Sequence, residues 1–214
     1  MPRRQVLTDR QRSSLLDLPT DDTALLHHYT LADEDIEQVR RRRQSHNRLG
    51  FALQLCAFRY PGRLLSPGEV IPIEVARFIA AQLGERADDL SCYAETDVTR
   101  RRHLVELREI YGYKMFTGRG ARDLKIWLEG AAETARSNED LARRFVEQCR
   151  ASQTILPGIT VVERLCADAL VAAERRVDAR IFGQLGDDMR TRLDALLTED
   201  AGGSVTRFVW LRQF

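Results

Sequence analysis

Two arginine-rich segments carry the residue types in this chain that are best suited to binding a charged ligand. The sequence contains 31 arginines but two lysines, and its formal net charge is +1. GC-rich codon usage would explain the preference for arginine over lysine, but it does not explain where the arginines lie. Residues 38–68 include seven arginines and no acidic residue. Such a local excess of positive charge predicts a surface that binds the phosphates of a nucleic acid.

The first basic segment is the run Arg40–Arg43, which His46, Asn47 and Arg48 follow. Its guanidinium groups can neutralise phosphates, and the amide of Asn47 can hydrogen-bond the edge of an adenine. A second interpretation is structural, because the acidic residues at 33–37 would begin a helix and the arginines would end it, as the helix macrodipole favours. Asn47 could likewise cap the helix that follows. The sequence leaves both interpretations open.

The second basic segment spans residues 99–125, where eight Arg or Lys residues accompany three acidic residues. Arg100–His103 begins one predicted helix, and Arg119, Arg122 and Lys125 form a face near the start of the next. The N-terminal end of a recognition helix is the part that reaches base edges. The candidate DNA-binding residues are therefore Arg40, Arg41, Arg42, Arg43, His46, Asn47, Arg48, Arg100, Arg101, Arg102, His103, Arg119, Arg122 and Lys125.

The sequence lacks the motifs of common catalytic and cofactor sites. It has no GxxxxGK[ST] phosphate loop, no HExxH zinc motif and no GxSxG nucleophile motif. The four cysteines (Cys56, Cys92, Cys149 and Cys166) include no CxxC pair, which argues against a zinc ribbon or a disulfide framework. We therefore expect no catalytic residue, no metal site and no cofactor in this chain.

Apolar residues make up 43% of the sequence, which is enough for a hydrophobic core. No apolar run approaches the roughly 20 residues that a membrane span requires. The N-terminal residues show no apolar segment of the kind that a secretory signal needs. We therefore expect a cytoplasmic protein that does not enter the membrane.

Apolar residues recur at helical spacing along almost the whole chain. Capping sequences that begin at Thr8, Ser66, Ser137 and Thr160 mark helix starts. The predicted helices span residues 8–17, 22–28, 32–43, 46–59, 68–83, 99–111, 118–132, 137–151, 159–183 and 186–197. Only Val205–Leu211 has the composition of a strand. The predicted fold class is therefore all-α.

Proline and glycine at residues 60–62 and 156–158, and glycine at residue 84, interrupt the helical pattern. We predict an N-terminal helix-turn-helix-like DNA-binding unit at 1–63, a second helical DNA-binding unit at 64–135, and a helical connector at 136–214. The first unit would place a basic third helix on two short helices, which is the plan of helix-turn-helix and homeodomain modules.

Each predicted unit has an apolar stripe that would face its core. In the first unit Ile36 and Val39 would face inward, while Gln38, Arg41 and Arg42 would point outward. The stripes of the second unit are Leu104, Leu107 and Ile110, and Leu124, Trp127, Leu128 and Ala131. The long helix of the connector has the stripe Ile159, Val162, Cys166, Ala169, Ala173, Val177 and Ile181.

Several longer strings in the sequence occur in the order known from one protein family. They are Asn47–Cys56 with Arg59–Gly62, Thr99–His103, Tyr111–Tyr113, Leu156–Cys166 and Thr206–Gln213. In this order they resemble the N-terminal region of Tn-three family replicative transposases. The resemblance extends over essentially all 214 residues.

The resemblance implies a function for this chain and a separation between a DNA-binding region and a catalytic domain. Transposases of this family are several times longer and carry an RNase-H-like catalytic domain with an Asp-Asp-Glu triad, expected to use Mg²⁺, near the C-terminus. Their N-terminal region binds the terminal inverted repeats of the transposon. The resemblance therefore implies that this chain binds double-stranded DNA in the bacterial cytoplasm, at the nucleoid, and does not cut it.

Two other functions fit the same residues. The chain could be a free-standing helix-turn-helix regulator, or a helical scaffold whose basic faces bind acidic protein partners. The oligomeric state is not set by the sequence, and the resemblance is compatible with a dimeric full-length transposase and a monomeric fragment.

Overall fold

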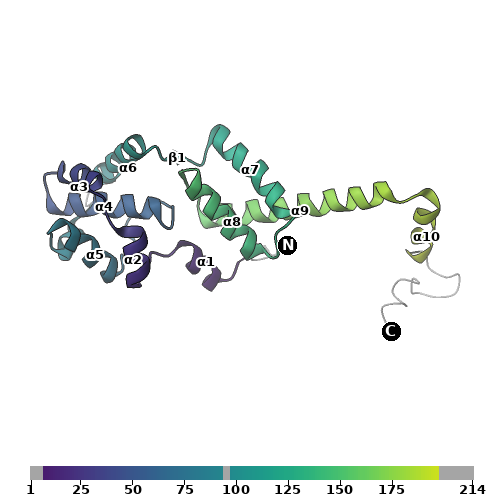
Figure 1. The fold of residues 1–214 in the computed structure, drawn as a ribbon, viewed down its shortest axis with the longest axis horizontal. Coiled ribbons are helices and arrows are strands. Elements are labelled where there is room, and N and C mark those ends of the chain that lie inside the picture. The colour runs from purple at the N-terminus through teal and green to yellow at the C-terminus, as the bar shows by residue number, and fades with distance from the viewer. Residues whose placement is uncertain (1–6, 94–96, 198–214) are drawn as a thin grey trace. The chain divides into compact units, whose positions relative to one another are not determined.

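The computed structural model describes residues 7–93 and 97–197, which are almost entirely helical (Figure 1). The elements are α1 (Asp9–Leu16), α2 (Asp22–Tyr29), α3 (Asp33–Arg40), α4 (Ser45–Arg59), α5 (Ile73–Leu83), the 3₁₀ helix η1 (Ala87–Cys92), α6 (Asp97–Tyr111), β1 (Lys114–Met115), α7 (Gly118–Ala132), α8 (Asn138–Ala151), β2 (Thr154–Ile155), α9 (Ile159–Gln184) and α10 (Asp187–Leu197). The all-α prediction is confirmed. The predicted strand at Val205–Leu211 lies outside the described residues.

Side-chain caps explain why two of the helices begin where they do. Thr8 Oγ1 accepts a hydrogen bond from the Gln11 amide at 3.3 Å, and Gln11 Oε1 accepts one from the Thr8 amide at 2.8 Å. This reciprocal pair is a capping box, which satisfies backbone donors that the first turn of a helix leaves unpaired. Ser137 Oγ likewise accepts from the Asp140 amide at 3.1 Å at the start of α8. Both caps confirm the sequence prediction.

The capping sequence that begins at Ser66 forms a turn, so the predicted helix at 68–83 begins too early. The Glu69 carboxylate accepts hydrogen bonds from the Ser66 amide at 2.8 Å and from Arg63 Nη2 at 2.6 Å. Gly68 has a φ of +71°, a left-handed conformation that does not continue a right-handed helix. The observed helix α5 therefore begins five residues after the predicted start, at Ile73.

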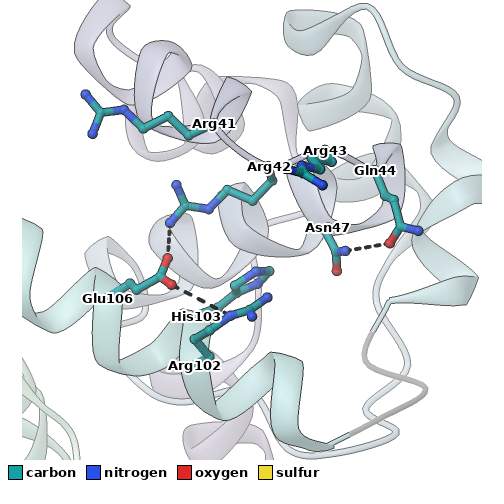
Figure 2. A pocket seen from close by; sticks show the side chains of 8 residues that line it. All are labelled: Arg41, Arg42, Arg43, Gln44, Asn47, Arg102, His103 and Glu106. Carbon is teal, nitrogen blue, oxygen red and sulfur yellow. Dashed lines mark hydrogen bonds and ion pairs between the residues drawn. The ribbon is translucent and has the colours of Figure 1, made fainter.

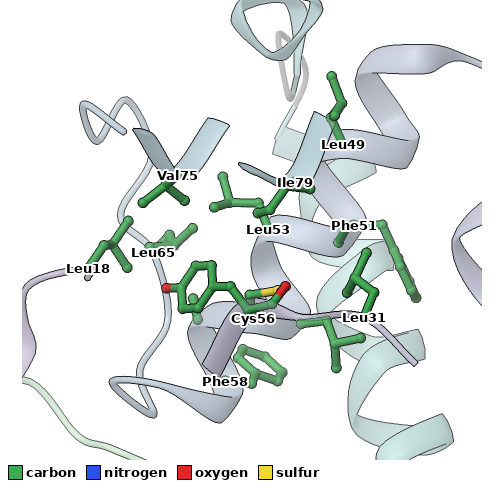
Figure 3. Packing of buried hydrophobic residues seen from close by; sticks show 14 of the residues in the cluster. Leu18, Leu31, Leu49, Phe51, Leu53, Cys56, Phe58, Leu65, Val75 and Ile79 are labelled. Atoms are coloured by element: carbon green, nitrogen blue, oxygen red, sulfur yellow. The ribbon is translucent and has the colours of Figure 1, made fainter. Parts of the chain in front are cut away.

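Helix α4 lies at the centre of the first part of the fold. Every residue from Leu49 to Phe58 is buried, and the helix packs against α2, α3, α5, η1 and α6 (Figure 1). A helix that is apolar on all sides must be covered on all sides. Figure 3 shows Leu53, Cys56 and Phe58 of this helix among the neighbouring apolar side chains.

The largest cluster of buried residues draws on all three predicted segments. It contains Leu18 and Val39 from the first, Val75 and Leu107 from the second, and Ile155 from the third. The three segments therefore share one core. That each of them is a separate DNA-binding unit stays a prediction.

A short parallel pairing joins the end of α6 to the end of α8. Lys114 pairs with Thr154 and Met115 with Ile155 in β1 and β2, and the Leu156 amide donates to the Gly62 carbonyl at 2.8 Å. The sequence analysis did not predict these strands, because a two-residue strand is too short to produce an alternating pattern.

The chain divides into two compact units, residues 1–170 and 171–214. In the first unit the predicted apolar stripe of α9 is buried at Val162, Cys166 and Ala169. In the second unit the stripe residue Ala173 is buried, whereas Ile181 is 53% exposed. The interpretation of the stripe as core is therefore wrong at Ile181, and the alternative, a surface for a partner helix, is not tested.

Candidate nucleic-acid interface

The turn between α3 and α4 displays most of the first basic segment. Helix α3 ends at Arg40 and residues 41–44 form the turn, so the predicted helix at 32–43 is wrong in its last three residues. The Arg42 amide donates to the Val39 carbonyl at 3.1 Å, which tightens the end of the helix into this turn. The side chains of Arg41 and Arg43 are exposed there.

Arg48 holds this turn in place from the first turn of α4. Its Nη1 donates to the carbonyl oxygens of Arg42 and Arg43, both at 3.1 Å. Its Nε donates to Glu85 Oε1 at 2.6 Å, and this hydrogen bond lowers the pKa of the Glu85 carboxyl from its ordinary value. These contacts give Arg48 a supporting role within the protein. That it also binds DNA stays a prediction.

Arg42 turns inward, contrary to the prediction that it points away from the core. Its side chain is 11% exposed and its guanidinium carbon lies 3.6 Å from the centre of the Phe51 ring. Nη1 donates to the Gln38 carbonyl at 2.7 Å, and Nη2 forms an ion pair with Glu106. The cation–π contact and the ion pair offset part of the hydration that the guanidinium loses, and burial still lowers the pKa of Arg42 from its ordinary value.

A pocket of about 600 Å³ lies between this turn and helix α6 (Figure 2). It is lined by Arg41, Arg42, Arg43, Gln44, Asn47, Arg102, His103 and Glu106. The two basic segments are far apart in the sequence, and the fold brings them to one place. This juxtaposition depends on the packing of α6 against α4.

His103 supports the wall of the pocket. The residue is 1% exposed, its ring packs edge-on against Phe51 and stacks on Tyr93, and Tyr93 Oη lies 3.1 Å from its Nδ1. Burial, with the nearby positive charges of Arg42 and Arg102, lowers the pKa of His103 to about 4. At neutral pH the imidazole is uncharged, so His103 adds no positive charge to the pocket.

The pocket has an excess of positive charge. Four arginines line it, and Glu106 is the acidic residue among its lining side chains. Arg41 also pairs with Glu37 at 3.2 Å, but both side chains are more than 60% exposed. An exposed pair of this kind is worth at most about 1 kcal/mol, so it does not prevent Arg41 from meeting a phosphate.

The amide of Asn47 lies at the edge of the pocket beside that of Gln44. Asn47 Nδ2 donates to Gln44 Oε1 at 2.9 Å. Helix α4 begins at Ser45, so Asn47 lies within the first turn and is not the N-cap. The alternative interpretation of Asn47 as a helix cap is therefore wrong.

Other predicted residues lie outside the lining of this pocket. Arg40 is exposed at the end of α3 and His46 is half-buried. Arg100 Nη1 donates to the Leu65 carbonyl at 2.8 Å, and Arg101 is exposed on α6. On the same helix Leu107 is buried as predicted, whereas Ile110 is 44% exposed and was wrongly assigned to the core.

Helix α7 presents the remaining basic candidates away from the pocket lining. Arg119, Arg122 and Lys125 are all exposed, and Arg119 pairs with Asp123 at 3.9 Å. The opposite face of the helix is buried at Ala121, Leu124, Leu128 and Ala132. Trp127 and Ala131 are half-buried, so the predicted core stripe is shifted by one position at its end. The basic face of α7 is therefore open to solvent.

The sequence reasoning missed two residues that line the pocket, Glu106 and Gln44, and Phe51, which lies under Arg42. Glu106 follows Arg102 by four positions, the spacing of an ion pair on one helix turn, and this signal could have identified it. Gln44 follows the arginine run directly. The position of Phe51 under Arg42 has no local signal, because it depends on the turn between α3 and α4.

Within residues 7–93 and 97–197, no three His, Cys, Asp or Glu side chains come together as metal ligands. Among the described helices, none is both long and apolar enough to cross a bilayer.

Comparison with known proteins identifies the family to which the chain belongs. Residues 6–169 match the family described as "Domain of unknown function (DUF4158)". The chain is 40% identical over 213 residues to the transposase for transposon Tn3926 of Escherichia coli. It is 38% identical over 216 residues to the transposase for transposon Tn501 of Pseudomonas aeruginosa, and 37% identical over 213 residues to the transposase for transposon Tn21 of Escherichia coli.

Each of these alignments covers 100% of this chain and 22% of the relative. The chain thus spans about a fifth of the length of the transposases that it matches. The family match covers most of the chain, and the relatives match all of it. The chain therefore belongs to the DUF4158 family, and its relatives are Tn-three family transposases.

Proposed function

We propose that this chain is a non-catalytic, DNA-binding part of a Tn-three family transposase that recognises the terminal inverted repeats of its transposon. The observation that carries this proposal is the pocket in which Arg41, Arg42 and Arg43 meet Arg102. Arginines from two elements that converge on one surface are suited to contact the closely spaced phosphates of duplex DNA.

The relatives support the same conclusion. They are transposases, and a transposase must locate DNA as well as cut it. This chain matches about a fifth of their length, and its sequence carries no catalytic motif. A DNA-locating role therefore fits this chain better than the chemical step, which we assign to the rest of the protein, together with any Mg²⁺.

Two surfaces would make different contacts with the DNA, one chiefly with phosphates and the other chiefly with bases. The pocket at the turn between α3 and α4 carries the exposed charge of Arg41 and Arg43, which suits contact with phosphates. On α7, Arg119 and Arg122 lie near the N-terminus of a helix whose opposite face is buried. A helix placed in this way can enter the major groove, so we assign base reading to these two residues and to Asn47.

A binding titration tests the proposal. Fluorescence anisotropy would compare a duplex that carries the terminal inverted repeat with a scrambled duplex of the same composition. We expect tighter binding to the repeat and a salt dependence that reports several phosphate contacts. The Arg122→Ala variant should lose about 1–3 kcal/mol of this preference while it keeps much of the binding to the scrambled duplex. Equal weak binding of the wild-type chain to both duplexes would contradict sequence-specific recognition.

A further inference from the structure

Glu106 lies inside the basic pocket, between guanidinium groups from two elements (Figure 2). Its Oε2 accepts a hydrogen bond from Arg42 Nη2, and its Oε1 lies 3.7 Å from Arg102 Nε. The carboxylate therefore has the position and the charge that a backbone phosphate would need to contact both arginines at once.

The side chains of Arg42, Glu106 and Arg102 differ in exposure, and this difference would allow a phosphate to replace the Glu106 carboxylate. Arg42 is 11% exposed, so an anionic partner stabilises its charge both in the free protein and in a complex. Glu106 is 36% exposed and Arg102 is 65% exposed, so both are open to solvent. A carboxylate that leaves this pocket would regain hydration, and an incoming phosphate would meet the charge of Arg42 in its place.

We propose that Glu106 occupies, in the free protein, the position of a DNA backbone phosphate and competes with DNA for Arg42 and Arg102. This inference rests on the proposed DNA-binding function. When DNA binds, a phosphate replaces the carboxylate between the two guanidinium groups. Glu106 thus lowers the affinity of the pocket for duplex of any sequence.

A purely structural role for Glu106 gives the opposite prediction. If the carboxylate only joined α6 to the turn before α4, its loss would loosen the pocket and weaken DNA binding. The substitution Glu106→Gln removes the negative charge but keeps an oxygen that can accept from Arg42. The variant therefore distinguishes competition between Glu106 and DNA from a structural role of Glu106 in the pocket.

The test compares the wild type, E106Q and the control E109Q on one duplex of random sequence over a range of salt concentrations. Glu109 is exposed on the same helix and lies outside the pocket lining, so E109Q makes the same change in net charge. We expect E106Q to bind on the order of tenfold more tightly, because the wild type must first break the charge-assisted hydrogen bond between Arg42 and Glu106, whereas E106Q breaks a weaker, uncharged one. The plots of log affinity against log salt should have the same slope, because a phosphate occupies the same position in both complexes. E109Q should stay close to the wild type.

A second variant tests whether the gain in affinity of E106Q depends on Arg102. In the double variant E106Q/R102Q one of the two guanidinium groups is also removed, and the gain in affinity should disappear. Arg102 is mostly exposed, so its replacement should leave the fold intact, which thermal unfolding checks. An E106Q affinity equal to that of E109Q, or lower than that of the wild type, would overturn the proposal.

The outcomes also separate this inference from the proposed function. If the wild type and all variants fail to bind any duplex, both proposals are wrong. If the wild type prefers the inverted repeat but E106Q equals E109Q, only the competition by Glu106 is wrong. A free phosphate ion is the other ligand that could occupy the position between the two arginines. To test it, inorganic phosphate is titrated into the complex of E106Q with duplex at constant ionic strength, and chloride serves as the control. If phosphate displaces the duplex far more strongly than chloride does, the pocket is a site for free phosphate, and the assignment to DNA is overturned.

Discussion

Arg41 and Arg42 are neighbours in the sequence, but their guanidinium groups differ in exposure and in the contacts that they make. The Arg41 side chain is 61% exposed and pairs with Glu37 across one turn of helix. The Arg42 side chain is 11% exposed, covers the Phe51 ring and pairs with Glu106. One guanidinium is therefore presented to solvent, and the other also holds the protein together.

This difference predicts separable effects of alanine substitutions. Arg41→Ala should flatten the slope of log affinity against log salt by about 0.9 and leave stability within about 0.5 kcal/mol of the wild type. Arg42→Ala should weaken DNA binding and also lower the free energy of unfolding by about 1–3 kcal/mol, because Glu106 and the Gln38 carbonyl lose their donor. Salt titrations and urea unfolding measure the two quantities. If neither variant changes affinity or slope, the DNA-binding surface lies on α7 instead.

The buried imidazole of His103 makes stability depend on pH. Its pKa of about 4 in the folded protein lies below the ordinary value of 6.5, chiefly because burial disfavours the charged form. Between these values the unfolded chain binds more protons, so this contribution is complete above pH 6.5 and is lost as the pH falls towards 4. We expect a loss of about 1–3 kcal/mol over this interval.

Urea unfolding at several pH values checks the His103 prediction. His103→Gln keeps a polar partner for Tyr93 but does not titrate, so its stability should change less between pH 6.5 and 4. An unchanged pH dependence in this variant would show that other groups cause the acid sensitivity. At neutral pH, the salt slope of DNA binding should be the same for both proteins, because His103 is uncharged there.

At the scale of elements, helices were the part of the structure that the sequence predicted best. Apolar spacing and the caps at Thr8 and Ser137 are local signals, and each described α-helix overlaps its predicted range, whereas η1 was not predicted. The start of α5 was predicted too early because Glu69, which has the spacing of a helix cap, binds Ser66 and Arg63 within a turn.

The candidate interface was only partly predictable for the same reason. The two basic segments could be identified from their arginines, but their meeting at one pocket depends on how α6 packs against α4. The inward turn of Arg42 depends on Phe51 and Glu106, which lie on different helices. No pattern within a single helix contains this information.

Gly50 of α4 lies against the ring of Tyr93, the residue that follows η1. A Cβ atom at this position would lie 2.1 Å from Tyr93 Cδ2, and Tyr93 in turn contacts His103. Gly50→Ala should therefore displace Tyr93, lower the free energy of unfolding by about 1–3 kcal/mol, and weaken DNA binding through the pocket wall.

Gly130→Ala is the matched control for this substitution. Gly130 is also inside a helix, but no atom lies within 4 Å of the position its Cβ would take. Alanine should therefore stabilise α7 by about 0.5–1 kcal/mol. Urea unfolding of both variants measures the contrast. A Gly50→Ala protein as stable as Gly130→Ala would contradict the close contact with Tyr93.

At the scale of the whole molecule, the proposed DNA binding should need no metal ion. The arginines of the pocket and of α7 supply positive charge directly, so we expect the same affinity for duplex DNA with and without a chelator. Anisotropy titrations in the presence of EDTA and of Mg²⁺ measure this. A tenfold or greater loss of affinity with the chelator would reveal a ligand set that this reasoning missed.

Ile155 sits in the same core as Leu18 and Val39, although it comes late in the chain. A ribosome adds about 5–20 residues per second, so this side chain follows Phe58 by roughly 5–20 seconds. During that interval the apolar surface around α4 has been made but lacks part of its cover. A nascent chain of this protein therefore offers chaperones a defined period in which to bind, and the period ends when β2 emerges and pairs with β1.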